Sequence, residues 1–332
     1  MTDDKPRLGV AMIGYAFMGR AHSQAWRNAH RFFDLPLEPH MAMLVGRDEE
    51  RATAAAAQLG WDAVETDWRR AIERDDVDVV DICTPGDTHA EIAVAALEAG
   101  KHVLVEKPMA NTVAEAEAMA AAAATARERG VRAMVGFTYR RVPAVQLARQ
   151  LVAEGRIGEV RQVRAQYLQD WLADENAPLS WRLDKEKAGS GALGDIGAHI
   201  VDLTQFVTGH RFAGVSGTLD TFVTERPVAE SFSGLQGTAG TERGPVTVDD
   251  AALFTARLTN GAPAVLEASR FAWGRKNAMR IEVNGTTGSV AFDFEDMNVL
   301  EFYDATEPAA TAGFRRILVT EGDHPYIEAW WP

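Results

Sequence analysis

The chain has 332 residues, of which 46% are hydrophobic, and a formal net charge of -14 at pH 7. This length and apolar content are enough for a large core and predict two domains. The negative charge opposes binding to a phosphate backbone, so we expect no nucleic-acid partner. No segment has the apolar length of a membrane span or the character of a secretory signal, which predicts a cytoplasmic protein without a membrane partner.

The first predicted strand covers residues 8–13, and the loop GYAFMG follows at residues 14–19. In a dinucleotide-binding loop, Gly14 allows the tight turn and Gly19 allows the helix to pack closely on the strand. Ala16 stands where such loops usually have their middle glycine. Because any strand-turn-helix needs glycine for steric reasons, this loop by itself leaves phosphate binding open.

Strand and helix patterns then alternate as far as residue 136. The further predicted strands are residues 41–45, 77–83, 103–105 and 132–136, and the predicted helices are residues 49–59, 87–99 and 113–129. This alternation is typical of a parallel sheet covered on both faces. We therefore predict a doubly wound Rossmann domain over residues 1–138. The single cysteine, Cys83, excludes an intramolecular disulfide and a thiolate metal cluster, and we expect it to be an inert core residue.

Candidate cofactor residues lie at the carboxyl ends of these strands, where open parallel sheets bind dinucleotides. They are Gly14, Ala16, Phe17, Met18, Gly46, Arg47, Asp48, Thr84, Pro85, His89, Glu106 and Lys107. Gly46 and Arg47 offer room and a guanidinium for a 2'-phosphate, which favours NADP. NAD stays possible, because a small shift in register would present the Asp48 carboxylate to the ribose.

Lys107 follows the fourth predicted strand, within the sequence Glu106-Lys107-Pro108. A lysine at this edge can donate a hydrogen bond to a substrate oxygen and stabilise its developing negative charge. The alternative is a surface lysine beside an acid, which has no functional role. Its place at the end of a strand favours the functional interpretation.

The pattern changes after residue 138, where a helix over residues 143–154 and a strand over residues 160–167 are predicted. A group of polar and aromatic residues follows: Gln169, Asp170, Trp171, Trp181 and Arg182. Aromatic rings beside amides and carboxylates suit a polyhydroxylated ring, which has apolar C–H faces and hydroxyl edges. The same residues would also serve as packing groups in a long connection, and the sequence leaves both interpretations open.

The C-terminal part is mostly strands, at residues 251–258, 264–271, 279–283, 289–294 and 299–303, with a hairpin turn at Asn260-Gly261. They predict an α+β domain over residues 139–332 with a large, mainly antiparallel open sheet. One face of that sheet is free for another subunit. Residues 226–249 are rich in Gly, Ser, Thr and Pro, and we expect a long mobile loop there, a lid or an oligomer arm.

A predicted helix over residues 193–207 carries Asp195 and His199 one turn apart, with Asp202 three residues further on. An imidazole with a carboxylate beside it is a general-base arrangement, because the carboxylate fixes the ring and stabilises its charged form. A carboxylate that complements the helix dipole and a core histidine would give the same pattern. These three residues could also bind a divalent metal, but a fourth ligand is not evident.

Four segments carry a family resemblance: AFMGRAH at 16–22, TPGDTHAEIAVAALEAGKHVLVEKP at 84–108, YRRVPA at 139–144 and GALGDIGAHIVDL at 191–203. In this order and spacing the chain resembles the Gfo/Idh/MocA oxidoreductases, the family of glucose-fructose oxidoreductase and inositol dehydrogenase. Within that family, YLQDW at 167–171, PLSWR at 178–182 and GSGALGDI at 189–196 look most like the levoglucosan dehydrogenases, which oxidise the C3 hydroxyl of an anhydrosugar.

The resemblance implies that Lys107, Asp195 and His199 form the catalytic set. His199 would take the hydroxyl proton while hydride leaves the same carbon for nicotinamide, and Lys107 would orient that oxygen with the support of Asp195. It also implies further contacts: to the sugar from Tyr139, Gln169, Asp170 and Trp171, and to the cofactor from Trp181 and Arg182.

The chain departs from the subgroup at Gly46-Arg47, where NAD-using levoglucosan enzymes resemble each other in having an acid, so NADP is favoured over NAD. The family's usual C-terminal helical segment is expected to be missing after Trp330-Trp331-Pro332. The resulting prediction is an NAD(P)-dependent dehydrogenase of a sugar, anhydrosugar or cyclitol that forms a dimer or tetramer through its C-terminal sheet. The rival is a non-catalytic sensor of the same fold that binds dinucleotide or sugar.

Overall fold

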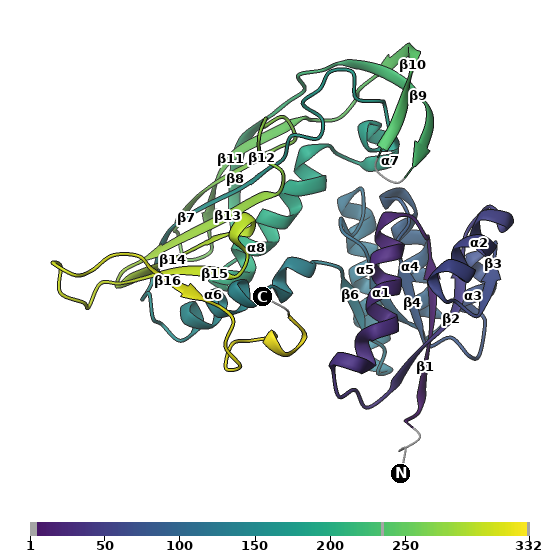
Figure 1. Ribbon diagram of the computed structural model, residues 1–332, viewed down its shortest axis with the longest axis horizontal. Helices are drawn as coiled ribbons and strands as arrows, with labels where there is room; N and C mark the ends of the chain where they lie inside the picture. The colour runs from purple at the N-terminus through teal and green to yellow at the C-terminus, as the bar shows by residue number, and fades with distance from the viewer. Residues whose placement is uncertain (1–4, 234–235, 331–332) are drawn as a thin grey trace. The chain divides into compact units, whose positions relative to one another are not determined.

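The computed structural model describes residues 5–233 and 236–330 (Figure 1). The chain divides into two compact units: unit 1 has residues 1–136, 186–189 and 231–237, and unit 2 has residues 137–185, 190–230 and 238–332. Within the described ranges, no helix has both the length and the apolar character needed to cross a membrane.

Unit 1 contains a six-stranded sheet in the order β3-β2-β1-β4-β5-β6, with every pair of neighbours parallel. Its strands are β1 (Arg7–Ile13), β2 (Glu38–Val45), β3 (Ala63–Glu65), β4 (Val79–Ile82), β5 (His102–Val105) and β6 (Ala133–Val135). The connecting helices are α1 (Phe17–Phe32), α2 (Glu49–Leu59), α3 (Trp68–Ile72), α4 (His89–Glu98) and α5 (Val113–Glu128). The predicted doubly wound parallel sheet is confirmed.

Both faces of this sheet are buried, because alternate residues of β1 pack into different cores. Val10 and Met12 belong to one hydrophobic cluster, whereas Ala11 and Ile13 belong to another. All four side chains are at most 4% exposed. This explains why the strand reads as a continuous apolar run rather than an alternating one. The sequence did not predict β3 and α3, which are too short to show a period.

Unit 2 contains an eight-stranded sheet in the order β16-β15-β14-β13-β7-β12-β11-β8. Its strands are β7 (Val160–Leu168), β8 (Phe212–Asp220), β11 (Ala251–Leu258), β12 (Pro263–Ser269), β13 (Ala278–Gly285), β14 (Gly288–Asp293), β15 (Val299–Asp304) and β16 (Arg315–Leu318). Only the β7–β12 pair is parallel among these neighbours, so the predicted mainly antiparallel sheet is confirmed.

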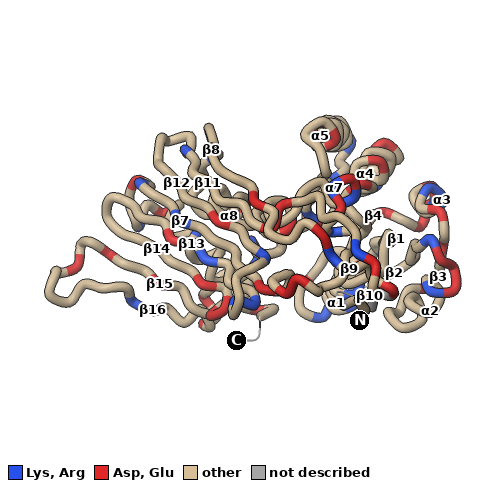
Figure 2. The backbone as a smooth tube through the Cα atoms, turned by 90° about the horizontal axis from the view of Figure 1, so that it is seen from above, with Lys and Arg blue, Asp and Glu red and all other residues tan. Residues whose placement is uncertain are grey.

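Helices α6 (Pro143–Ala153) and α8 (Ala198–Thr208) cover one face of the eight-stranded sheet (Figure 1). Ile200 of α8 and Val163 of β7 are fully buried in the core between them. Charged residues occur along the strands of this sheet (Figure 2), and Arg164 of β7 pairs with Glu282 of β13, which pairs in turn with β14 through Arg280 and Asp293 on the same face. The sheet therefore has one apolar face under two helices and one polar face, as is common for antiparallel sheets.

The expectation of a long mobile loop over residues 226–249 is wrong. These residues contribute β9 (Glu225–Ser233) and β10 (Gln236–Pro245), which pair in a sheet of two strands. The anchor is Arg226, which is fully buried and donates from Nη2 to the carbonyl oxygen of Leu172 at 2.6 Å and from Nη1 to that of Asp174 at 2.7 Å. The composition of residues 226–249 suggested a loop. It gave no sign of the strands, because Arg226 is held by backbone carbonyl groups about fifty positions earlier in the chain.

The predicted helix over residues 193–207 is also different at its start. Residues Leu193–Gly197 form a π-helical turn, and α8 begins only at Ala198. Asp249 caps this turn, since its carboxylate accepts the backbone N–H groups of Gly191 and Leu193, each at 2.7 Å. Gly191 has no room for a side chain, because a Cβ would lie 1.8 Å from the carbonyl oxygen of Asp249. Turns of this kind are frequent at functional sites.

The remaining short helix, α7 (Lys185–Ala188), precedes this turn.

Candidate active site

The loop after β1 has the geometry of an anion-binding loop. Gly14 has a φ of +98° and lies so close to the neighbouring strand that a Cβ would be 2.8 Å from the carbonyl oxygen of Cys83. Gly19 is equally confined, since its Cβ would lie 2.2 Å from the carbonyl oxygen of Gly14. Helix α1 has Ala16 as its N-cap, with no side-chain hydrogen bond to the first turn. The backbone N–H groups of that turn are thus uncapped by a side chain, which fits a pyrophosphate.

The two other predicted residues of this loop differ in exposure. Phe17 is 54% exposed, whereas Met18 packs against one of the two cores of unit 1. Tyr15 was not predicted as a site residue. Its ring fills the space beside Gly46, where a Cβ would lie 2.1 Å from Cε1 of Tyr15. The signal was an aromatic residue directly after the turn glycine. Tyr15 therefore links the loop after β1 to the end of β2.

At the end of β2, Arg47 is exposed while the Asp48 carboxylate is engaged by its own helix. Asp48 is the N-cap of α2, accepts the N–H of Arg51 at 3.0 Å, and lies 3.3 Å from Nε of the same arginine. A capping carboxylate of this kind stabilises the helix start. Asp48 is thus occupied in capping α2, whereas the Arg47 guanidinium is exposed at the carboxyl end of β2.

Thr84, Pro85 and His89 lie together after β4. The His89 ring is 1% exposed, and its two nitrogens each lie 2.9 Å from a carbonyl oxygen, that of Thr84 and that of Pro108. The imidazole thus ties the loop after β4 to the loop that carries Lys107. Both ring nitrogens bind backbone, so His89 positions the two loops, and its contact with the cofactor stays a prediction.

Glu106 faces inward to a charged cluster with His22 and Asp81. The His22 ring places Nδ1 2.9 Å and 3.0 Å from the two oxygens of Asp81, and Nε2 3.1 Å from Oε1 of Glu106. Burial alone would lower the pKa of His22, but the hydrogen bonds to Asp81, Cys83 and Glu106 and the charge of Asp81 raise it to about 12. The imidazole is therefore protonated at neutral pH.

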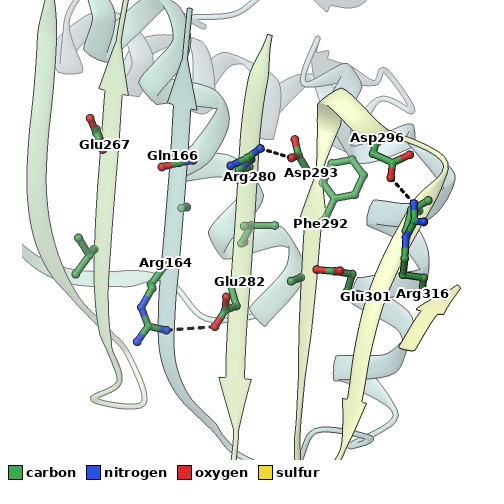
Figure 3. Close-up of a pocket in the computed structure, with 15 residues that line it drawn as sticks. Arg164, Gln166, Glu267, Arg280, Glu282, Phe292, Asp293, Asp296, Glu301 and Arg316 are labelled. Carbon is green, nitrogen blue, oxygen red and sulfur yellow. Dashed lines mark hydrogen bonds and ion pairs between the residues drawn. The ribbon is translucent and has the colours of Figure 1, made fainter. Parts of the chain in front are cut away.

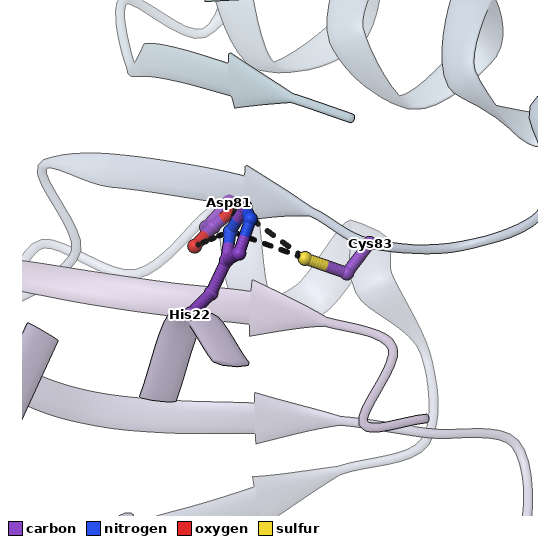
Figure 4. A group of neighbouring side chains, drawn as sticks. All are labelled: His22, Asp81 and Cys83. Atoms are coloured by element: carbon purple, nitrogen blue, oxygen red, sulfur yellow. Dashed lines mark hydrogen bonds and ion pairs between the residues drawn. The ribbon is translucent and has the colours of Figure 1, made fainter. Parts of the chain in front are cut away.

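Cys83 closes one side of this cluster (Figure 4), with Sγ 3.4 Å from Nδ1 of His22 and 3.6 Å from Oδ1 of Asp81. Burial raises the pKa of the thiol to about 12, so it is neutral and poorly nucleophilic, which fits the expectation of an inert core residue. Among the described residues, His22, Asp81 and Cys83 are the group whose side chains could hold a metal ion. Both ring nitrogens of His22 already lie at hydrogen-bond distance from carboxylate oxygens of Asp81 and Glu106, and we interpret the group as a hydrogen-bonded network.

In unit 2, the predicted base His199 lies on the first turn of α8 among aromatic rings. Its ring centroid is 4.6 Å from that of Tyr139, 5.8 Å from that of Tyr167 and 6.0 Å from that of Phe137. The ring is 8% exposed. The structure therefore brings together two predicted site residues: His199, which the family resemblance assigned to the catalytic set, and Tyr139, which it assigned to the sugar pocket.

A chain of polar groups continues from Tyr139. Its hydroxyl lies 2.6 Å from that of Tyr167, which donates to Oδ1 of Asn277 at 2.5 Å, and Gln169 donates to the same Oδ1 at 3.0 Å. Burial, reinforced by Tyr139, raises the pKa of Tyr167, so its hydroxyl keeps its proton. We did not predict Tyr167 or Asn277 as site residues. Asn277 lies on a distant segment, and no local pattern pointed to it.

Asp195 lies near two arginines of the same unit. Nη1 of Arg270, a fully buried residue, is 3.7 Å from Oδ2 of Asp195. Burial lowers the pKa of Arg182, and the charge of Asp195 partly offsets this. The two guanidinium groups also lie over indole rings, Arg270 at 5.6 Å from Trp171 and Arg182 at 4.6 Å from Trp181. The sequence gave no signal for Arg270, which is a single arginine after a strand.

The two tryptophans are 40% and 38% exposed, so each presents part of its ring for a ligand.

Two predicted partners are engaged elsewhere. Asp202 does not join Asp195 and His199, because Arg140 binds both of its oxygens, with Nε 2.8 Å from Oδ2. The metal site considered for these three residues is therefore not formed in the described part of the chain. Asp170 accepts from Lys276 Nζ at 2.7 Å and from the N–H of Gly274 at 3.1 Å, and the Lys276 contact lowers its pKa. Its carboxylate holds the segment that carries Asn277.

Two features are those expected of a dinucleotide-dependent dehydrogenase: a glycine loop before the N-terminus of α1 in unit 1, and a histidine among polar and aromatic groups in unit 2. Residues 8–137 match the model described as "Oxidoreductase family, NAD-binding Rossmann fold", and residues 145–291 match "GFO/IDH/MocA C-terminal domain". The chain belongs to the Gfo/Idh/MocA oxidoreductase family. The resemblance inferred from its motifs is confirmed, and the protein is an enzyme of the class that oxidises CH–OH groups with a nicotinamide dinucleotide.

Several known proteins are similar over nearly the whole chain. The levoglucosan dehydrogenase of Pseudarthrobacter phenanthrenivorans is 43% identical over 330 residues, which cover 98% of this chain and 83% of that protein. The crystal structure of an oxidoreductase domain protein from Kribbella flavida is 70% identical, with a TM-score of 0.93 over 98% of this chain and 84% of that one. A levoglucosan dehydrogenase complex with NADH and levoglucosan is 42% identical, with a TM-score of 0.90 and the same coverage.

Proposed function

We propose that this enzyme oxidises a secondary hydroxyl of a sugar, anhydrosugar or cyclitol, with C3 of a pyranose as the favoured position. The observation that carries the proposal is the arrangement around His199, whose ring lies beside a chain of hydroxyl and amide groups suited to a polyol. The similarity to levoglucosan dehydrogenase supports an anhydrosugar within this class.

Three residues serve the reaction in this proposal. His199 accepts the hydroxyl proton, Lys107 donates a hydrogen bond to the same substrate oxygen, and Asp195 supports the positive charge that forms on the imidazole. When bound, the nicotinamide dinucleotide takes up the hydride that leaves the carbinol carbon. Nη1 of the fully buried Arg270 lies 3.7 Å from Oδ2 of Asp195, and this ion pair favours the charged form of the carboxylate.

We propose that Tyr139, Gln169 and Trp171 recognise the substrate. Tyr139 and Gln169 offer a hydroxyl and an amide, and we propose that Trp171 offers an aromatic face to the C–H groups of the ring. Tyr167 and Asn277 orient Tyr139 and Gln169 through the hydrogen bonds described above. Trp181 and Arg182 are proposed to lie beside the dinucleotide, and Asp170, whose carboxylate also accepts a hydrogen bond from Lys276, is proposed to line the sugar pocket.

We propose NADP as the preferred dinucleotide, with NAD as the alternative. The support is local: the Arg47 guanidinium is exposed, and the nearby Asp48 carboxylate caps α2 rather than extending toward a ribose. An exposed guanidinium suits a 2'-phosphate, whereas an NAD site usually has an acid that binds the 2'-hydroxyl. Levoglucosan dehydrogenase has been crystallised in complex with NADH, which supports NAD as the alternative.

We also propose that the enzyme self-associates to a dimer or tetramer through the polar face of the eight-stranded sheet (Figure 3). That face carries the ion pairs Arg164–Glu282, Arg280–Asp293 and Arg316–Asp296. Two apolar side chains lie on the same face, Leu253 and Val265, which are 45% and 48% exposed. Sedimentation velocity would test this: Leu253→Glu should yield monomers, and an unchanged sedimentation coefficient would reject this face as the interface.

A screen of pyranoses, anhydrosugars and inositols against NADP and NAD, followed by absorbance of the reduced dinucleotide, tests the proposed reaction. We expect turnover with at least one anhydrosugar or pyranose that has a free C3 hydroxyl, and none with the matching 3-deoxy compound. Dinucleotide binding without turnover of any polyol would instead support the sensor. Turnover of the 3-deoxy compound would reject C3 as the reacting position.

A further inference from the structure

We propose that the buried network of His22, Asp81 and Glu106 positions Lys107, so that His22 and Asp81 are positioning residues of the reaction. The inference rests on the proposed role of Lys107 and names residues that have no part in the mechanism above. The sequence motif that contains His22 carried the family resemblance but no function of its own. All four residues belong to unit 1.

A series of hydrogen bonds connects helix α1 to the loop of Lys107. Asp81 on β4 accepts from Nε1 of Trp26 at 2.7 Å and from Nδ1 of His22 at 2.9 Å. On its other side the His22 ring donates from Nε2 to Oε1 of Glu106 at 3.1 Å. The second oxygen of Glu106 accepts the backbone N–H of Lys107, also at 3.1 Å. The orientation of the Glu106 carboxylate therefore fixes the peptide unit from which the Lys107 side chain begins.

The charges make this arrangement specific. An ionised carboxylate only accepts hydrogen bonds, so an imidazole that lies between two of them must carry a proton on each nitrogen. Asp81 is fully buried, Glu106 is 5% exposed and His22 is 8% exposed, so water cannot replace a missing partner. The geometry fits an imidazolium that donates from Nδ1 to Asp81 and from Nε2 to Glu106, so each of the two carboxyl groups is tied to the same ring.

Packing leaves the Glu106 carboxylate little freedom to move. A Cβ on Gly136 would lie 2.9 Å from Oε1 of Glu106, so the glycine makes room for the carboxylate and limits its movement on that side. The N–H of Gly136 is bound to the carbonyl oxygen of Val105 at 2.8 Å, which fixes this glycine to the strand before Glu106. Cys83 fills the space beside the His22 ring. Confinement and charge together define one position for the start of the Lys107 side chain.

The test replaces His22 by glutamine in the full-length chain, with His40→Gln as the matched control. His40 is also a histidine of unit 1 paired with a carboxylate, Asp62 at 2.8 Å, but this pair is exposed. The first readout is hydrogen exchange at the Lys107 backbone amide, which needs no turnover. We expect faster exchange in His22→Gln and wild-type exchange in His40→Gln. Unchanged exchange in both variants would overturn the proposal.

The second readout shows whether His22 acts through Lys107. We expect His22→Gln to lower kcat by about tenfold or more while the dissociation constant of the dinucleotide stays within about twofold, because misplaced groups lose rate rather than cofactor binding. In the Lys107→Ala background, the same His22→Gln change should cost almost nothing further. An independent, multiplying loss in the double variant would refute positioning through Lys107.

The two readouts separate this proposal from the proposed function. If the wild type turns over no polyol but the Lys107 amide exchanges faster in His22→Gln, the network is upheld and the function fails. If His22→Gln does not fold, Trp26→Phe replaces it, since this variant removes only the hydrogen bond from the indole to Asp81. In Trp26→Phe, we expect a smaller increase in the exchange rate of the Lys107 amide and a smaller loss of kcat than in His22→Gln. Exchange and kcat both equal to those of the wild type would count against the network.

Discussion

The two units each bury a histidine to the same extent, yet the two rings have different surroundings. His22 and His199 are both 8% exposed. His22 lies between two carboxylates, which hold it as a cation, whereas the rings of Tyr139 and Tyr167 lie beside His199, which we propose accepts a proton from the substrate. An imidazole fixed in its charged form cannot accept a proton, and a histidine that acts as a base must be able to do so. The two histidines are equally buried, so the groups that each ring contacts, rather than the degree of burial, distinguish the structural cation His22 from the candidate base His199.

The largest expected effect comes from removing the candidate base. His199→Ala should lower kcat by roughly a hundredfold to ten-thousandfold, the usual contribution of general-base catalysis, while dinucleotide binding is retained. His210→Ala, which changes a histidine of the same unit outside the cluster, should turn over like the wild type. Steady-state rates and fluorescence titration with dinucleotide measure the two properties. A His199→Ala enzyme with wild-type kcat would remove the base from the account.

The second prediction concerns the other histidine and the pH dependence of stability. The pKa of His22 is about 12 in the folded chain, against an ordinary value of 6.5, so its stabilising contribution is fully present below 6.5 and is lost as the pH rises toward 12. Between about pH 7 and about pH 9, the free energy of unfolding should fall by up to about 1.4 kcal/mol per pH unit. Urea unfolding at both pH values measures it.

His40→Gln should keep this fall, because the change leaves the buried network intact. Equal stability of the wild type at the two pH values would mean that His22 is not held as a cation, and the contrast between the two histidines would disappear.

A third prediction separates cofactor recognition in unit 1 from chemistry in unit 2. Arg47→Ala should weaken NADPH binding by about 1.5 to 3 kcal/mol, the value of a hydrogen bond to a charged group, and leave NADH nearly unchanged. Arg51→Ala is the matched control, because Arg51 ion-pairs with Asp48 and belongs to the same surface. Equal weakening of NADPH and NADH by Arg47→Ala would reject the 2'-phosphate contact.

The smallest effect is expected at the hydroxyl chain beside His199. Tyr167→Phe removes the bonds to Tyr139 and Asn277 and should lower the free energy of unfolding by about 1 kcal/mol. Because Tyr139 and Gln169 would be oriented less well, KM for the polyol should rise more than kcat falls. Tyr303→Phe, in the same sheet but outside the cluster, serves as control. A lower kcat at unchanged KM would place Tyr167 in the chemical step instead.

Local chemistry made much of unit 1 predictable from the sequence. Helix α2 was predicted with its observed bounds, because Asp48 caps its start and Gly60, with a φ of +80°, ends it. Helix α5 starts with a capping box formed by Thr112 and Glu115. Strands β1 and β4 were evident from apolar runs that both cores of the unit require. Signals of this kind depend on neighbours in the chain, so a single sequence is enough to read them.

The parts that the sequence did not predict depend on distant partners. The π-helical turn at Leu193–Gly197 is capped by Asp249, and β9 is anchored by the binding of Arg226 to carbonyl groups before it in the chain. Asn277 and Arg270 reach the site from strand ends whose register only the fold defines. The charged state of His22 also needed the structure, because its two carboxylate partners come from β4 and from the loop after β5.

The central claim is that a carbinol hydrogen of the substrate passes to the dinucleotide with His199 as the base. The most direct measurement uses levoglucosan deuterated at C3 and follows the label into the reduced dinucleotide by mass spectrometry, with the wild type and His199→Ala in parallel. The account predicts labelled dinucleotide with the wild type and none with His199→Ala over the same time. Equal labelling by both enzymes, or none by either although the dinucleotide is bound, would contradict it.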